Sequence, residues 1–159
     1  MTLKNYQMKK IKVTTEGTNY SAMDLGEFEG LMEYSYLHPK LNQEVKGKVF
    51  VGELLKATGV EISFQILRPD TAIPFIHKHN LHEEVYIILK GSGQFQVDQQ
   101  CFNVKEGSIV RIAPEGERTL RNNSIAPLIF MVIQSQAGSL DQHFIFDGYR
   151  VKREIAWDD

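Results

Sequence analysis

The chain has 159 residues, of which 42% are hydrophobic and 24% charged, and its formal net charge is −2 at pH 7. This length fits one domain with a sizeable core, and the nearly balanced charge gives no basic excess that would attract nucleic acid or an anionic membrane. Cys101 is the single cysteine, which excludes an intrachain disulfide and a cysteine-based metal site.

The N-terminal residues carry no apolar segment of the kind found in secretory signals, and no apolar run in the chain is long enough to span a bilayer. We therefore expect a cytoplasmic protein.

Taken in chain order, residues 1–47 form an irregular extension in which only 10–14 and 34–37 have the composition of short strands. From residue 48 the strand pattern is clearer. Residues 48–55 are interpreted as a strand, with a short helical turn as the alternative, and residues 60–67 as another strand, which ends at the Arg-Pro-Asp turn that follows.

The second half of the chain continues this pattern of short strands. Residues 94–97 and 101–104 alternate polar and apolar side chains and predict a hairpin. Further strands are expected over 109–112, 118–122, 127–134 and 144–146. Short strands that recur at about ten-residue intervals, with turns between them, are typical of an all-β sandwich or barrel.

The stretch 74–93 holds three of the five histidines and two adjacent carboxylates. His77 and His79 are two residues apart, so on a strand both side chains point to the same face, with Cα atoms roughly 7 Å apart. Glu83 and Glu84 begin the next strand and point to opposite faces, so one of them can meet the histidines. Two imidazoles and one carboxylate form a set that binds divalent transition metals and leaves positions open.

These residues resemble the first motif of the cupin superfamily. The pattern consists of His77-x-His79, four residues, Glu84, six residues and Gly91, and the spacing to Gly91 selects Glu84 over Glu83. The resemblance implies metal ligation by His77, His79 and Glu84. The longer pattern through residue 98 is similar to that of single-domain cupins whose substrate is not known.

The resemblance also implies the architecture. It predicts an all-β, antiparallel double-stranded β-helix (jelly-roll) barrel over residues 48–135. Residues 1–47 would then be an N-terminal extension that packs on the barrel or swaps with a second copy, and 136–159 a C-terminal extension. Single-domain cupins of this kind are commonly homodimers, so a homodimer is expected.

The second cupin motif is incomplete in this chain. Six residues, one more than the usual spacer, separate Gly107 from Pro114-x-Gly116, and two further residues lead to Thr119. In this alignment Thr119 stands where cupins have the histidine that is the fourth metal ligand. Because a hydroxyl is a much weaker ligand than imidazole, the departure also favours a metal-free alternative.

Other residues are weaker candidates for a ligand or for the pocket. His82 is either a substitute fourth ligand or a solvated turn residue. Arg121 shares strand parity with Thr119 and is either an anchor for a carboxylate or phosphate or part of a rim salt bridge to Glu83 or Glu84. Tyr86 either lines the pocket or packs in the core. Arg111 and Arg118 are expected to be exposed, and Cys101 to be a packing residue.

Three functions are compatible with this pattern. In the first, an Fe, Mn, Ni or Zn ion on the two histidines and the glutamate serves an enzyme acting on a small molecule, with dioxygenase, isomerase and decarboxylase chemistry all known among cupins. In the second, the barrel is a non-catalytic module that binds a small polar ligand. In the third, the protein has a regulatory or assembly role through its dimer surface.

Overall fold

The computed structural model describes residues 11–157. Thirteen strands and a single 3-10 helix, η2 (Phe28–Glu33), make up its regular structure. The all-β prediction is therefore confirmed.

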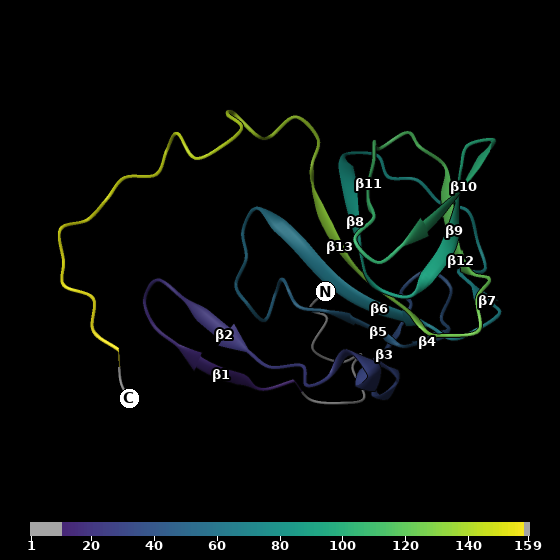
Figure 1. Ribbon diagram of the computed structural model, residues 1–159, viewed down its shortest axis with the longest axis horizontal. Coiled ribbons are helices and arrows are strands. Elements are labelled where there is room, and N and C mark those ends of the chain that lie inside the picture. The colour runs from purple at the N-terminus through teal and green to yellow at the C-terminus, as the bar shows by residue number, and fades with distance from the viewer. Residues whose placement is uncertain (1–10, 158–159) are drawn as a thin grey trace.

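The two main sheets are antiparallel and face each other (Figure 1). The four-stranded sheet has the order β10-β9-β12-β7 and the five-stranded sheet has the order β11-β8-β13-β6-β5. Their strands are β5 (Lys48–Phe50), β6 (Val60–Leu67), β7 (Thr71–Ala72), β8 (His82–Lys90), β9 (Ser92–Val97), β10 (Gln100–Lys105), β11 (Ile109–Ile112), β12 (Arg118–Asn122) and β13 (Leu128–Gln136).

The main core lies between the two sheets. It joins Phe95 and Leu120 of the four-stranded sheet to Tyr86 and Phe130 of the five-stranded sheet. Along β8 every second residue from Glu84 to Ile88 is buried, as expected for a strand that turns alternate side chains toward a core.

The outer face of the five-stranded sheet is covered by the N-terminal part of the chain. Leu31 and Tyr34, in and after η2, form a second buried cluster with Val49, Ile66 and Ile129 of that sheet. This cover explains why residues 128–130 of β13 are buried on both faces. The division of the chain at residues 47 and 135 stays a prediction.

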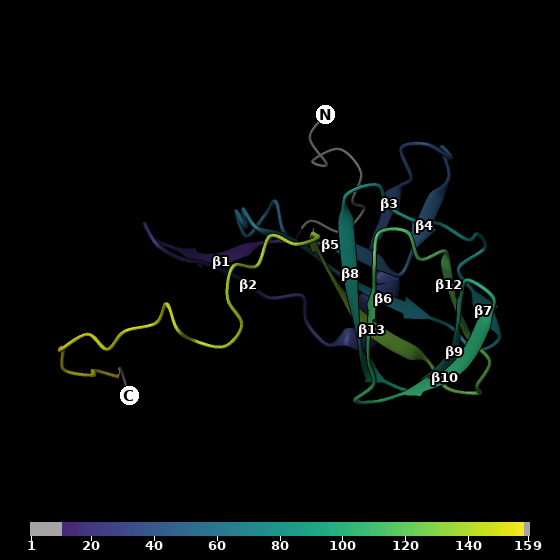
Figure 2. The ribbon, with the colours of Figure 1, turned by 90° about the horizontal axis from the view of Figure 1, so that it is seen from above.

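Two short hairpins lie outside the main sheets. β1 (Val13–Glu16) pairs with β2 (Ser21–Met23), and β3 (Ser35–Leu37) pairs with β4 (Glu44–Lys46). The β1–β2 hairpin and the C-terminal residues extend away from the barrel on the same side (Figure 2). Residues 138–157 are exposed throughout.

Three local expectations were wrong. The strand that begins at Lys48 ends at Phe50, because the amide of Leu55 bonds the Val51 carbonyl and turns the chain. Residues 144–146 form no strand and have no pairing partner among the described residues. Cys101 is exposed on β10.

The turn between β8 and β9 requires glycine. Gly91 has φ +84°, and a Cβ atom at this position would lie 2.3 Å from the carbonyl oxygen of Pro127. The close approach places the start of β13 against the turn.

Within residues 11–157, no helix has the length and apolar character needed to cross a membrane.

Candidate metal centre

The His-x-His segment is held against β12 by backbone hydrogen bonds. His77 and Arg118 exchange two of them, with N–O distances of 3.1 and 3.0 Å, and the amide of His79 donates to the Pro114 carbonyl at 3.1 Å. This short bridge orients both side chains in the same direction, and the imidazole centroids lie 5.5 Å apart.

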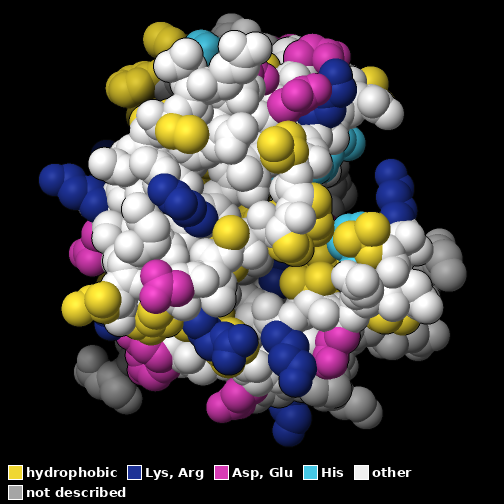
Figure 3. Space-filling model, turned by 90° about the vertical axis from the view of Figure 1, so that its right-hand side faces the viewer, with side chains coloured by type: hydrophobic (Ala, Val, Ile, Leu, Met, Phe, Trp, Pro, Cys, Tyr) yellow, Lys and Arg dark blue, Asp and Glu magenta, His cyan; other side chains and the backbone are white. Residues whose placement is uncertain are grey.

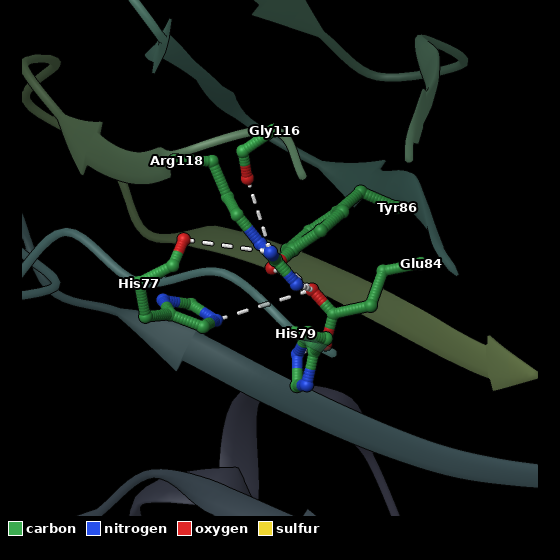
Figure 4. Close-up of polar contacts among 6 residues, drawn as sticks. All are labelled: His77, His79, Glu84, Tyr86, Gly116 and Arg118. Atoms are coloured by element: carbon green, nitrogen blue, oxygen red, sulfur yellow. Dashed lines mark hydrogen bonds and ion pairs between the residues drawn. The ribbon is translucent and has the colours of Figure 1, made fainter. Parts of the chain in front are cut away.

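Glu84 projects from β8 toward these rings and is 6% exposed. Its Oε1 lies 3.2 Å from Nε2 of His79, and its Oε2 lies 4.0 Å from Nε2 of His77. A ligand atom from each of the three residues lies within 4.8 Å of the other two. Figure 4 shows the three side chains converging. The structure therefore brings together the three residues of the predicted ligand set.

The second oxygen of Glu84 is held by Arg118 and Tyr86. Nε and Nη2 of Arg118 donate to Oε2 at 3.2 and 2.5 Å, and the Tyr86 hydroxyl donates to the same atom at 2.7 Å. Nη1 of Arg118 donates to the carbonyls of His77 and Gly116. These contacts hold the carboxylate in one orientation and leave Oε1 on the side of the histidines.

Burial and charge set the protonation of the centre. Burial lowers the pKa of His77 to about 4, and the adjacent positive charge of Arg118 acts in the same direction. Burial also lowers the pKa of His79. Burial alone would raise the pKa of Glu84, but the hydrogen bonds and charge of Arg118 outweigh it and lower that pKa. At neutral pH the centre thus consists of two neutral imidazoles and one carboxylate, the protonation states that metal binding requires.

Arg118 corrects two expectations. It is 1% exposed instead of lying at the surface, and it occupies the place beside Glu84 that the sequence alignment gave to Thr119. In β12 the buried residues are Arg118, Leu120 and Asn122, so Thr119 points the other way and its hydroxyl donates to the Ile73 carbonyl at 2.9 Å.

A signal for this arrangement was present in the sequence. Counted forward from Gly107 with the usual cupin spacing, the histidine position falls on residue 118, and the asparagine that follows four residues later falls on Asn122. Asn122 is buried and its amide bonds the carbonyls of Leu67 and Ala126. The extra residue before Pro114 is thus compensated before β12 begins.

The remaining candidate residues are not among the three converging ligands. Arg121 is exposed and donates to Gln94, so it neither faces the centre nor pairs with Glu83 or Glu84. Glu83 pairs with Arg111 on the opposite face of β8. His82 begins β8 and is outside the group of converging ligand atoms.

The donor set fits a divalent transition metal. Nε2 of His77 faces Oε2 of Glu84 at 4.0 Å, whereas its other ring nitrogen, Nδ1, is buried without a hydrogen-bond partner and does not face Glu84 (Figure 4). On the side of the centre, the buried nitrogen without a partner is Nε2 of His79. This atom lies near Glu84 Oε1 without the geometry of a hydrogen bond. Buried nitrogen atoms without partners are uncommon in proteins, and a metal ion would satisfy such lone pairs.

The centre is accessible from the protein surface. The side chains of His77 and His79 are 29% and 26% exposed. Figure 3, which views the side of the molecule that carries the four-stranded sheet, shows histidine side chains at the surface next to hydrophobic ones, and acidic and basic side chains interspersed. A small molecule can therefore reach the ligand residues.

Comparison with known proteins identifies the family. Residues 63–134 match the cupin domain. The chain is 31% identical to the uncharacterized protein MJ1618 of Methanocaldococcus jannaschii over 100 residues. The matched region covers 60% of this chain and 78% of that protein.

Solved structures agree with this assignment. A cupin protein, BF4112, from Bacteroides fragilis has 30% sequence identity and a TM-score of 0.70, covering 85% of this chain and 99% of that one. The predicted oxalate decarboxylase tm1287 from Thermotoga maritima shares the fold at 21% identity, with a TM-score of 0.52 over 60% of this chain and 83% of its own. Together with the two facing antiparallel sheets and the converging His77, His79 and Glu84, these similarities establish that the chain belongs to the cupin family.

Proposed function

We propose that this cupin holds a divalent transition metal on His77, His79 and Glu84 and binds, or acts on, a small polar molecule beside it. The observation that supports the proposal is the convergence of three ligand atoms within 4.8 Å, together with the buried Nε2 of His79, which faces Glu84 and has no hydrogen-bond partner. Fe, Mn, Ni and Zn all suit such nitrogen and oxygen ligands.

Arg118 is compatible with this proposal because it engages only one oxygen of Glu84. Oε2 accepts the hydrogen bonds of Arg118 and Tyr86, whereas Oε1 remains on the side of His79. Partners of this kind orient a ligating carboxylate and tune the metal. With arginine in the place of the usual fourth ligand, the protein would supply three ligands and leave the other positions to solvent or substrate.

A bound metal would supply Lewis-acid polarisation of a chelating ligand, and the choice among dioxygenase, isomerase and decarboxylase chemistry stays open. The metal-free binding module is the second candidate. The specific observation in its favour is the Arg118–Glu84 ion pair, because the guanidinium already neutralises the carboxylate.

Metal analysis separates the two candidates. Untagged protein is expected to retain stoichiometric Fe, Mn, Ni or Zn after dialysis, measured by mass spectrometry of the metal. His79→Asn is expected to abolish retention. His82→Asn, a change to a histidine outside the converging group, is expected to leave it intact. Wild-type protein that takes up none of the four ions under anaerobic, neutral conditions would refute metal binding and favour the metal-free module.

We further propose that the protein is a homodimer in which the C-terminal residues 138–157 are covered by the second copy. These residues extend from the barrel (Figure 1). They expose many large apolar side chains. These side chains are those of Leu140, Phe144, Ile145, Phe146, Tyr149, Val151, Ile155 and Trp157. Such a number of apolar side chains on one segment is typical of a protein interface.

Light scattering after size-exclusion chromatography tests the dimer. The double substitution Phe144→Ser and Phe146→Ser is expected to shift the protein toward the monomer, whereas Gln142→Ala, in the same segment, is not. A wild-type protein that is monomeric at high micromolar concentration would contradict the proposal. The cytoplasmic location stays a prediction.

A further inference from the structure

The inner face of the five-stranded sheet carries a lysine in an unusual position. Lys48 of β5 pairs with Gln65 of β6, Gln65 pairs with Phe130 of β13, and Phe130 pairs with Ile88 of β8. Residues that face each other across neighbouring strands point to the same side of a sheet. Since Phe130 and Ile88 belong to the core between the two sheets, Lys48 also points into the barrel.

The Lys48 side chain leans along its strand toward the metal centre. Its Nζ lies 5.0 Å from the centroid of the Phe50 ring, two residues further along β5. Phe50 belongs to the next row across the sheet, which runs through Ser63 and Val132 to Tyr86. Tyr86 in turn bonds Glu84. The ammonium therefore lies on the same inner face as the proposed metal ligands.

The charges at the centre act on this ammonium. Burial lowers the pKa of Lys48, the charges of Glu84 and Glu61 act to raise that pKa, and the charge of Arg118 acts to lower it. The influence of Glu84 and Arg118 on Lys48 agrees with the position of Lys48 on the inner face, as derived from the strand register. The lysine and the ligand residues thus share one electrostatic environment.

Within residues 11–157, Lys48 differs from Arg118 in having no ion-pair partner. Arg118 directs Nε and Nη2 to Glu84, and Nη1 to two carbonyls, so its guanidinium is already occupied. Among the ion pairs of the described part of the chain, none involves Lys48. Lys48 is half-buried, and a partly desolvated cation without an anion is costly, so an anionic ligand would relieve that cost.

The neighbouring side chains on this wall are polar. Gln65 and Ser63, both buried, point to the same face of the sheet as Lys48 and Phe50. Across the barrel lie two neutral histidines. Two carboxylates act on Lys48, namely Glu84, which Arg118 balances, and Glu61, whose Oε1 accepts hydrogen bonds from the amides of Gly52 and Ile62. Neither carboxylate forms an ion pair with Lys48 in the described part of the chain, so its ammonium is open to an anionic ligand, and a metal ion held by Glu84 would add positive charge to this face.

We propose that Lys48 binds the carboxylate of a small organic acid whose other end lies at the metal centre. The inference rests on the proposed function for the position of the metal but assigns the anion to a different residue. It replaces the earlier alternative in which Arg121 anchored the ligand, since Arg121 is exposed and bonds Gln94. A lysine ammonium is a compact charge on a flexible stem, suited to a single carboxylate.

Isothermal titration with malonate, in parallel with the uncharged isostere malonamide, tests the assignment. It is carried out on wild-type protein, on Lys48→Met and Lys48→Gln, and on Lys46→Met as a matched control. Lys46 lies on β4 and is exposed. Metal content and the circular dichroism spectrum are recorded for every sample, with and without added Zn²⁺. Phosphate is titrated as a second anion.

The wild type is expected to bind malonate and not malonamide. Either change at Lys48 is expected to weaken malonate binding about tenfold or more, the usual effect of one charged hydrogen bond, with unchanged metal content. Lys46→Met is expected to have no effect. Two Lys48 substitutions are used so that a folding defect in one of them leaves the comparison intact.

The experiment distinguishes failure of the Lys48 assignment from failure of the proposed metal site. Protein that binds metal and shows the same malonate affinity with and without the Lys48 ammonium would overturn this inference alone, as would wild-type protein that binds no malonate. Protein that takes up no metal but shows Lys48-dependent malonate binding would overturn the metal proposal and support the anion site. Tighter binding of phosphate than of malonate would overturn the assignment to a carboxylate.

Discussion

The buried ion pair between Arg118 and Glu84 provides the sharpest test of the structure. In Arg118→Met the long apolar stem is kept and the charge is removed. Arg118 is 1% and Glu84 6% exposed, so the substitution leaves a carboxylate without its cation inside the barrel. Removing one partner of a buried pair costs about 3–5 kcal/mol, because the remaining charge is uncompensated. The carbonyls of His77 and Gly116 also lose a donor, which places the expected loss in the upper part of that range.

The assay is urea unfolding followed by far-UV circular dichroism, since the single tryptophan, Trp157, is exposed and would report poorly on the core. Arg111→Met is the control. Arg111 pairs with Glu83 at the surface, where such pairs contribute less than about 1 kcal/mol. Adding Glu84→Gln to Arg118→Met should recover about 2 kcal/mol relative to the sum of the single changes, because neighbouring charges are energetically coupled.

Equal losses of unfolding free energy in Arg118→Met and Arg111→Met would refute the reasoning. That result would mean that Arg118 is solvated and that residue 119, not 118, faces the centre. Additive effects of the Arg118 and Glu84 substitutions would lead to the same conclusion.

Three further predictions concern the centre and its support. Because the pKa of His77 is lowered from 6.5 to about 4, its neutral form contributes stability that is present above pH 6.5 and lost as the pH falls toward 4, at most about 3 kcal/mol. Measured at a series of pH values, the free energy of unfolding should fall less steeply in His77→Gln than in the wild type or in His143→Gln. Parallel profiles would contradict this prediction. Gly91→Ala and Gly107→Ala both place alanine at φ +84°, but only the first brings Cβ against a carbonyl oxygen, so thermal unfolding should show Gly91→Ala to be the more destabilised by at least about 1 kcal/mol, and equal losses would count against the turn geometry. Thr119→Val should cost about 1 kcal/mol in urea unfolding through the lost hydrogen bond to Ile73 and leave metal content unchanged, whereas loss of metal would make Thr119 a ligand after all.

Local sequence patterns were sufficient to predict the type of fold. Short alternating segments bounded by turns predicted the all-β class, because the side-chain period of a strand is visible in the chain itself. The spacing of His77, His79 and Glu84 likewise indicated that these three side chains meet, and the structure brings them within 4.8 Å. Gly91 helped to choose the carboxylate because its turn sets where β8 ends.

The tertiary structure alone decided which residue completes the surroundings of Glu84. A one-residue shift in the loop before β12 exchanges the two faces of that strand, and the sequence does not show where such a shift is compensated. Burial then gives Arg118 its role, since a guanidinium beside a desolvated carboxylate is an ion pair and not a surface charge. The local pattern identifies Lys48 only as the first residue of a strand. The pairing of β5, β6, β13 and β8 places it on the inner face of the barrel, because pairing between distant strands is not encoded in any local pattern.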